Sequence, residues 1–228
     1  MPSSGGNPEP TKKRFEDLDL SGPMLKALRL AGYEYPTEIQ AGLIPLAFED
    51  EDVVGQARTG TGKTASFVIP ILEQLYPHRE KPGPQALILV PTRELAVQVS
   101  TEVVKLSTGQ RVHCVALYGG KPIRGQIEKL RRGAEIIVGT PGRVLDHLSR
   151  GTLKLDDVWC VVLDEADRML DIGFRPDIEK ILRRCPSDRQ TLLLSATVPP
   201  PIQKLAERYM CEPKFLNFSP KDLSVDTI

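Results

Sequence analysis

The sequence has no surplus of charge of either sign. Lysine plus arginine and aspartate plus glutamate both number 30 among the 228 residues, so the formal net charge is zero. Proteins that hold a polyanion on a broad basic face carry an excess of positive charge. The composition gives no sign of such a face, so any contact with nucleic acid must be local.

Cysteine is scarce, and the four that are present are dispersed: Cys114, Cys160, Cys185 and Cys211. They form no Cys-x-x-Cys pair and have no nearby histidine at a spacing suited to zinc. A chain of this length can bury a sizeable core without disulfides or metals. We therefore expect buried free thiols and one substantial domain.

A long apolar run is also missing, since none approaches the roughly 18 residues that a membrane helix needs. The first ten residues lack the charged and then apolar order of a secretory signal. We therefore expect a soluble, cytoplasmic, monomeric protein that makes no membrane contact.

Both ends of the chain are polar. Residues 1–13 contain Ser, Gly, Pro and charge but almost nothing apolar, which predicts a flexible tail. Residues 219–228 are also polar and are expected to form a linker. The folded domain is therefore expected over residues 14–218.

Between these ends, apolar runs of strand length alternate with segments of helical periodicity, which is typical of βαβ units. Ser21 is expected to cap a helix that ends at Gly32, and Thr37 a second helix that ends before Pro45. Strands are expected at 53–56, 86–90, 112–117, 135–138, 158–163, 191–194 and 215–218. Further helices are expected at 63–75, 93–106, 123–130, 143–149, 176–184 and 202–209. The predicted fold is α/β: a mostly parallel sheet of about seven strands with helices on both faces.

A glycine-rich turn lies between the first expected strand and the helix at 63–75. It consists of Ala57, Arg58, Thr59, Gly60, Thr61, Gly62, Lys63 and Thr64. In such a P-loop, glycines let backbone N–H groups converge on a phosphate, Lys63 reaches the β and γ oxygens, and the Thr64 hydroxyl can bind Mg²⁺. The alternative is an ordinary turn that starts a helix. The generic pattern begins with Gly, whereas this chain has Ala57, but the Gly-Lys-Thr ending at a strand-to-helix junction favours nucleotide binding.

Carboxylates follow the expected strand at 158–163, in the run Asp164-Glu165-Ala166-Asp167. Ligands of an open parallel sheet bind outside the carboxyl ends of its strands. There Asp164 can hold Mg²⁺ through water, and Glu165 can orient an attacking water. The alternative is that acidic residues favour helix N-termini, but a P-loop upstream in the same chain favours the catalytic interpretation.

These two motifs together resemble those of the DEAD-box ATP-dependent RNA helicases, in their N-terminal RecA-like domain. The resemblance covers nearly the whole chain after Phe15, and in this family the P-loop ordinarily starts with Ala. The other matching motifs, in order, are Gly32 to Gln40 (the Q motif), Pro91-Thr92-Arg93-Glu94-Leu95-Ala96, Gly119-Gly120, Thr140-Pro141-Gly142-Arg143 and Ser195-Ala196-Thr197. The resemblance implies a RecA-like helicase ATP-binding domain over residues 14–218.

The resemblance further implies that Gln40 reads the adenine edge of ATP, with Tyr33 stacking nearby and Phe15 and Thr37 supporting the pocket. Mg²⁺ arriving with ATP is the only metal expected. From the residues alone, Thr37 and Gln40 fit a helix capping box equally well, so both interpretations stay open. Hydrolysis is assigned to three residues: Lys63, Asp164 and Glu165.

The remaining motifs resemble the family's RNA-contacting and coupling elements. The RNA backbone would be held by Pro91, Thr92, Arg93, Gly119, Gly120, Thr140, Pro141, Gly142 and Arg143. Plain turns and a proline at a first helical position are the alternatives. Coupling between nucleotide and RNA would involve Asp167, Ser195 and Thr197. Their alternatives are a solvated carboxylate at a helix start and hydroxyls that cap a turn.

DEAD-box helicases have two RecA-like lobes, and nothing in this sequence resembles the second. The resemblance therefore implies that residues 219–228 start a linker to a second lobe, and that the first lobe alone is poorly active. Two other functions remain possible on sequence grounds, a nucleotide-gated RNA clamp and a DNA translocase. RNA and the second lobe are the expected partners.

Overall fold

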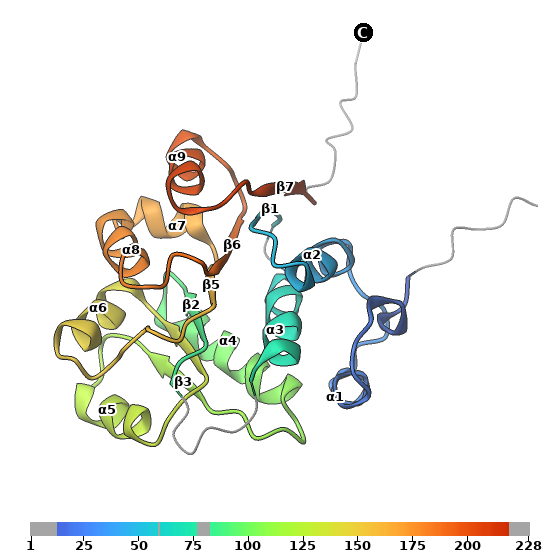
Figure 1. Cartoon of the computed structure of the whole chain (residues 1–228), viewed down its shortest axis with the longest axis horizontal. Coiled ribbons are helices and arrows are strands. Elements are labelled where there is room, and N and C mark those ends of the chain that lie inside the picture. Colours follow the sequence, from blue (N-terminus) through green and yellow to red (C-terminus); the bar gives the residue numbers. More distant parts are fainter. Residues whose placement is uncertain (1–12, 59, 77–82, 219–228) are drawn as a thin grey trace, which may run out of the picture.

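The computed structural model describes residues 13–58, 60–76 and 83–218. The expected tail apart from residue 13, the expected linker at 219–228, and Thr59 of the P-loop lie outside the described residues. Within them, the chain folds as a sheet between two layers of helices (Figure 1).

The sheet has seven strands in the described residues, in the order β3-β4-β2-β5-β6-β1-β7. Their bounds are β1 Val53–Gln56, β2 Ala86–Leu89, β3 Cys114–Leu117, β4 Ile136–Gly139, β5 Cys160–Leu163, β6 Gln190–Ser195 and β7 Lys214–Asn217. Every pairing among them is parallel. All residues of the central strands β2, β4, β5 and β6 are buried, because helices cover both faces. The predicted parallel sheet is confirmed.

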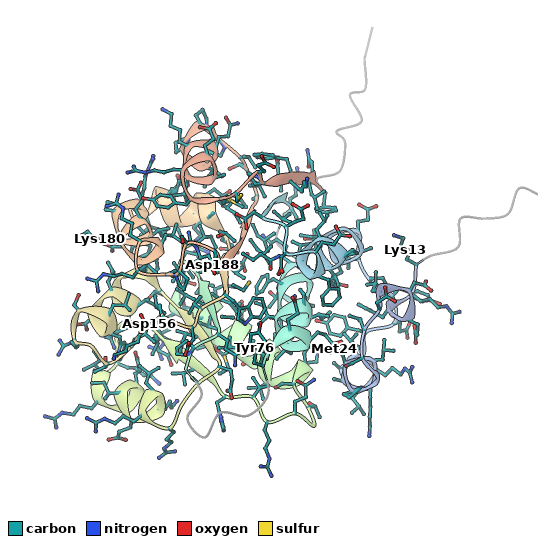
Figure 2. The ribbon with its side chains drawn as sticks, viewed as in Figure 1. Lys13, Met24, Tyr76, Asp156, Lys180 and Asp188 are labelled. Atoms are coloured by element: carbon teal, nitrogen blue, oxygen red, sulfur yellow. The ribbon has the colours of Figure 1, made fainter. Side chains whose placement is uncertain are left out.

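Helices connect the strands and divide between the two faces. Their bounds are η1 Phe15–Leu18, α1 Gly22–Leu30, α2 Glu38–Phe48, α3 Lys63–Gln74, α4 Arg93–Leu106, α5 Ile123–Arg131, α6 Pro141–Ser149, α7 Ala166–Asp171, α8 Arg175–Leu182 and α9 Pro200–Tyr209. One apolar cluster joins the sheet to η1 and α1–α4, and a second joins the other face to α6–α9. Side chains fill the space between the sheet and both helix layers (Figure 2).

Two expectations about helices are wrong. Helix α2 continues through Pro45 to Phe48, although a proline inside a helix removes one backbone hydrogen bond. Leu43, Ile44 and Ala47 are buried in the first apolar cluster, and this burial stabilises the full length of the helix. The short helix α7 was not expected, because a single turn and a half gives too few apolar positions to show a period.

The expectation of buried thiols holds for Cys160 and Cys185 only. Cys114 is half-buried, and Cys211 is exposed because it lies in the turn between α9 and β7. Within the described residues, no helix combines the length and apolar character needed to cross a bilayer.

All strands run in the same direction, so the loops that follow them gather at one edge of the sheet. The loop after β1 is joined there to the loop after β6. The Ala57 N–H donates to the Ser195 carbonyl at 2.9 Å, and the Gln56 amide donates to the Ala196 carbonyl at 3.3 Å. This edge carries the candidate site.

Candidate functional site

The P-loop turns tightly between β1 and α3. Gly60 and Gly62 have φ of 81° and 84°, in the left-handed region that glycine adopts without strain. The Thr61 hydroxyl donates to the Arg58 carbonyl at 2.8 Å and closes the turn. The predicted strand, glycine loop and helix are therefore present in this order.

Lys63 is the first residue of α3, and its ammonium is buried. The residue is 7% exposed, and Nζ has no hydrogen-bond partner among the described residues. A buried cation without partners is unfavourable unless an anion neutralises it. A phosphate at the start of α3 would supply that anion and would also meet the N–H groups of the helix N-terminus.

Asp164 directly follows β5 and is 2% exposed. Burial raises the pKa of its carboxyl to about 6; the positive charge of Lys63 opposes this rise, and the carboxylate of Glu165 adds to it. The Glu165 N–H donates to Asp164 Oδ1 at 2.9 Å. Asp164 is thus a buried carboxyl next to the P-loop, and it interacts electrostatically with the ammonium of Lys63.

Glu165 adopts the left-handed conformation, with φ of 52°. A non-glycine residue in this region is strained, and such residues cluster at functional sites. Its carboxylate forms an ion pair with Arg168, with Oε2 and Nη1 at 3.2 Å. Sequence reasoning missed Arg168, which carries no motif signal of its own.

Mg²⁺ fits the residues at this edge only as an ion that a nucleotide brings with it. The described residues contain no group of three or more His, Cys, Asp or Glu side chains that could hold a metal. Thr64 and Asp164 offer one hydroxyl and one carboxylate. That number suits Mg²⁺, which usually keeps several waters and binds through substrate phosphates.

Gln40 joins the Q motif to the P-loop. It is 1% exposed; its Oε1 accepts from the Thr37 N–H at 3.0 Å, and its Nε2 donates to the Gly62 carbonyl at 3.1 Å. Thr37 and Gln40 form a capping box at the start of α2. The capping alternative is therefore confirmed, and adenine recognition by Gln40 stays a prediction.

Phe15 and Tyr33 lie together, with ring centroids 6.2 Å apart in an edge-to-face arrangement. Both line a cavity of about 420 Å³ that also includes Gly32. The Tyr33 hydroxyl donates to Glu102 on α4 at 2.5 Å, and Lys105 lies over the Tyr33 ring. Burial, and then Glu102, raises the pKa of Tyr33. Stacking of Tyr33 on adenine stays a prediction.

The three expected coupling residues form one hydrogen-bonded group. The Asp167 N–H donates to Ser195 Oγ at 3.1 Å, and the Thr197 N–H and hydroxyl both donate to Asp167 Oδ2 at 3.0 Å. Partial burial alone would raise the pKa of Asp167, but the hydrogen bonds from Thr197, Arg168 and Ser195 outweigh it and lower the pKa. The loops after β5 and β6 are therefore locked together beside Asp164.

The expected RNA motifs follow β2, β3 and β4, which are neighbours at one side of the sheet. The Arg93 guanidinium lies 5.2 Å from the centroid of the Tyr118 ring, and a Cβ built on Gly120 would lie 4.0 Å from Arg93 Nη1. Arg143 Nη1 donates to the Lys121 carbonyl at 3.1 Å. The structure thus brings the three motifs together on one surface.

The two threonines of these motifs differ in their hydrogen bonds. Thr92 caps α4, because its hydroxyl accepts from the Leu95 N–H at 3.2 Å. Thr140 is the N-cap residue of α6, but its side chain makes no capping hydrogen bond. Pro141 is buried at the first position of α6, whereas Gly142 is exposed. Binding of RNA by these residues stays a prediction.

Comparison with known proteins gives a consistent result. The family model described as DEAD/DEAH box helicase matches residues 37–205. The chain is 50% identical over 214 residues to the DEAD-box ATP-dependent RNA helicase CshA of Bacillus subtilis, covering 94% of this chain and 43% of that protein. It is equally similar to the protein of that name from Geobacillus kaustophilus, covering 94% of this chain and 45% of that protein.

A solved structure has a similar fold. The crystal structure of a DEAD box protein from the hyperthermophile Methanococcus jannaschii has a TM-score of 0.86 and 48% sequence identity, covering 90% of this chain and 56% of that chain. The present chain spans less than half the length of the two curated relatives described above.

Proposed function

This chain belongs to the DEAD/DEAH box helicase family, and on that basis we propose that it is the ATP-binding lobe of an ATP-dependent RNA helicase. The lobe would couple binding and hydrolysis of Mg-ATP to RNA binding, and thereby to separation of short duplexes or remodelling of RNA–protein complexes. One observation carries the proposal. The buried ammonium of Lys63 has no hydrogen-bond partner among the described residues, and it interacts electrostatically with the carboxyl of Asp164.

The phosphates of ATP would be held by the start of α3. Lys63 would donate to the β and γ oxygens, and the N–H groups after Gly60 would converge on the same anion. Thr64 and Asp164 would hold the Mg²⁺ shell. When bound, Mg²⁺ would neutralise charge on the phosphates. Catalysis of this type depends almost wholly on positioning and on stabilisation of charge.

Glu165 would position or deprotonate the hydrolytic water. The left-handed conformation of Glu165, directly after Asp164, supports this assignment, because strained residues of this kind cluster at functional sites. The ion pair with Arg168 supports this role, because it holds the Glu165 carboxylate in one orientation.

RNA would bind along the loops after β2, β3 and β4. Arg93, Arg143 and Thr140 would hold phosphates and ribose hydroxyls, together with the N–H groups at Gly119 and Gly120. Because these contacts are few and local, they are compatible with a formal net charge of zero. A preference for RNA over DNA would come from contacts to the ribose 2′-hydroxyl.

We further propose that residues 14–218 are one RecA-like domain of a cytoplasmic, monomeric parent protein, and that residues 219–228 begin a linker to a second RecA-like lobe. The greater length of the curated relatives supports this. An arginine supplied from outside the P-loop contributes on the order of 10³ to 10⁵ in rate at related sites. The isolated lobe should therefore bind nucleotide weakly, hydrolyse it poorly and unwind little. Robust RNA-stimulated turnover by the 228-residue chain would contradict this part of the proposal.

The test is RNA-dependent phosphate release by the full two-lobe protein, wild type against Glu165→Gln. The proposal expects release that RNA stimulates in the wild type and a loss of most of it in the variant. Equal release by both would contradict the catalytic role of Glu165. ATP-dependent RNA binding without any turnover would instead indicate a clamp, and preference for a DNA strand of the same sequence would indicate a DNA translocase.

A further inference from the structure

We propose that Gln126 and His147 are positioning residues that hold the 118–121 loop in a fixed position relative to helix α6. They would thereby set the distance between the RNA contacts of the loop and those at the start of α6. This inference rests on the proposed function, because it assigns a role within the same RNA-binding surface. Neither residue belongs to a motif that the sequence reveals, and neither reaches the surface where RNA would lie.

Gln126 on α5 is the centre of a buried polar chain. It is 7% exposed, and its Nε2 donates to the Tyr118 carbonyl at 2.9 Å. Tyr118 directly precedes Gly119 and Gly120. The amide of Gln126 therefore fixes the backbone at the point where the 118–121 loop leaves β3.

His147 on α6 continues the chain and is fully buried. Its Nε2 lies 3.1 Å from Gln126 Oε1, and its Nδ1 lies 2.8 Å from the Thr152 hydroxyl. Because Gln126 Nε2 donates to a carbonyl, its Oε1 can only accept, so His147 donates through Nε2–H. A neutral ring then accepts at Nδ1 from the Thr152 hydroxyl, which also lies 3.1 Å from the His147 carbonyl. A buried network of this kind favours a single relative position of α5 and α6.

The 118–121 loop is also held at the surface, by Arg93 through the Tyr118 ring and by Arg143 through the Lys121 carbonyl. These two arginines are the residues proposed to bind RNA phosphates. Phosphate would compete with both surface contacts, since a guanidinium prefers a charged acceptor to a carbonyl or a ring. The buried contacts of Gln126 and His147 face no such competition, so they would keep the loop in place when RNA engages the arginines.

The experiment compares Gln126→Met with Gln85→Met in the 228-residue chain. Gln85 is a suitable control, because it is also buried and its side-chain amide also makes two hydrogen bonds, with the Tyr76 N–H at 2.8 Å and with the Tyr76 carbonyl at 3.2 Å. It lies just before β2, at the opposite edge of the sheet from the RNA motifs. Each variant removes a bond from the glutamine amide to a backbone carbonyl and replaces the amide with an apolar side chain of similar length.

Three quantities are measured: affinity for a labelled single-stranded RNA at low salt, affinity for Mg-ADP, and hydrogen exchange at residues 119–121. Gln126→Met should weaken RNA binding about fivefold, as expected for the loss of hydrogen bonds that order a ligand contact. It should speed exchange at 119–121 and leave the affinity for Mg-ADP unchanged. Gln85→Met should change neither RNA affinity nor exchange at 119–121.

Unchanged RNA affinity and unchanged exchange in Gln126→Met would overturn the inference, as would equal RNA losses in both variants. His147→Gln should restore most of the RNA affinity that His147→Leu loses, because a glutamine amide can still donate to Gln126 Oε1. If the wild-type chain binds no RNA, the proposed RNA surface fails and so does this role within it. Exchange at 119–121 would then still report whether Gln126 holds the loop, so the two failures are distinguishable.

Discussion

At the scale of single residues, Gly62 is the point where the P-loop touches the Q motif. A Cβ at Gly62 would lie 2.6 Å from Gln40 Nε2 and 3.0 Å from Thr37 Oγ1. Gly60 has nearly the same φ, but a Cβ there would meet nothing within 4 Å. An alanine at either position would strain the backbone, but only an alanine at Gly62 would also clash with its neighbours. Comparing the two substitutions therefore separates the two costs.

We predict that Gly62→Ala lowers the free energy of unfolding more than Gly60→Ala does. Left-handed strain costs alanine about 1–2 kcal/mol at either position, and only Gly62→Ala also displaces the amide of Gln40. Urea unfolding without nucleotide measures both variants. Equal losses would show that Gln40 and Gly62 are not in firm contact.

His147 gives a second residue-scale prediction, on pH. Burial, and then the charge of Arg143, lowers the pKa of His147 from the ordinary value of 6.5. The charge of Arg150 also lowers this pKa, and that of Asp146 raises it. The hydrogen-bond partners Gln126 and Thr152 are neutral. His147 therefore binds a proton more readily in the unfolded chain than in the folded one. Its contribution to the free energy of unfolding is fully present above pH 6.5 and falls as the pH drops below 6.5. His147→Gln cannot titrate, so between pH 7.5 and 5.5 its melting temperature should fall less than that of the wild type. Parallel curves would contradict a buried, neutral His147.

Residue positions differ in how far sequence alone could predict them. Lys63 at the start of α3 and Asp164 directly after β5 were predictable, because each belongs to a short local pattern at a strand end. Gln40 was ambiguous, since one pattern fits both a capping box and a base contact. Gln126 and His147 were not predictable, because their partners lie on other elements and form no local pattern.

At the scale of elements, Asp52 joins the starts of strands at the edge of the sheet opposite to the P-loop. Its carboxylate accepts from the Thr191 N–H on β6 and from the Cys211 N–H before β7, both at 2.6 Å. Burial raises the pKa of Asp52, although these two hydrogen bonds oppose the rise. One carboxylate thus fixes β6 and the approach to β7 against β1.

We predict that Asp52→Ala lowers the free energy of unfolding by about 2 kcal/mol, because a buried donor loses its acceptor. Asp52→Asn keeps one acceptor oxygen and should lose about half as much. The control is Asp188→Ala, because Asp188 is exposed and lines, together with Asp52, a cavity of about 490 Å³. Urea unfolding checks the series, and a loss no larger in Asp52→Ala than in the control would contradict the role.

Most strands and helices could be predicted from the sequence, because a doubly covered parallel sheet produces apolar runs that alternate with helical periods. The end of α2 could not, since Pro45 is a local stop signal that burial of Leu43 and Ile44 overrides. Helix α7 could not either, because a turn and a half gives too few apolar positions to show a helical period.

At the scale of the whole molecule, a neutral chain is proposed to bind RNA through a few contacts at one edge of its sheet. Affinity should then depend only weakly on salt. For single-stranded nucleic acid, the slope of log affinity against log salt is about −0.7 per neutralised phosphate. With Arg93 and Arg143 as the two cations, the predicted slope is about −1.4. Titrations over a range of salt measure it, and a slope several times steeper would reveal a broad basic face instead.

The central claim is that the loop between β1 and α3 binds the phosphates of a nucleotide through Lys63. Calorimetric titration of the 228-residue chain with Mg-ADP tests it, for wild type, Lys63→Met and Lys180→Met. Lys180 makes a matched control, since it lies exposed on α8 (Figure 2). The expected result is one saturable site, with affinity lowered at least about tenfold in Lys63→Met and unchanged in Lys180→Met. Equal binding by wild type and a folded Lys63→Met, or no binding by the folded wild type, would contradict the claim.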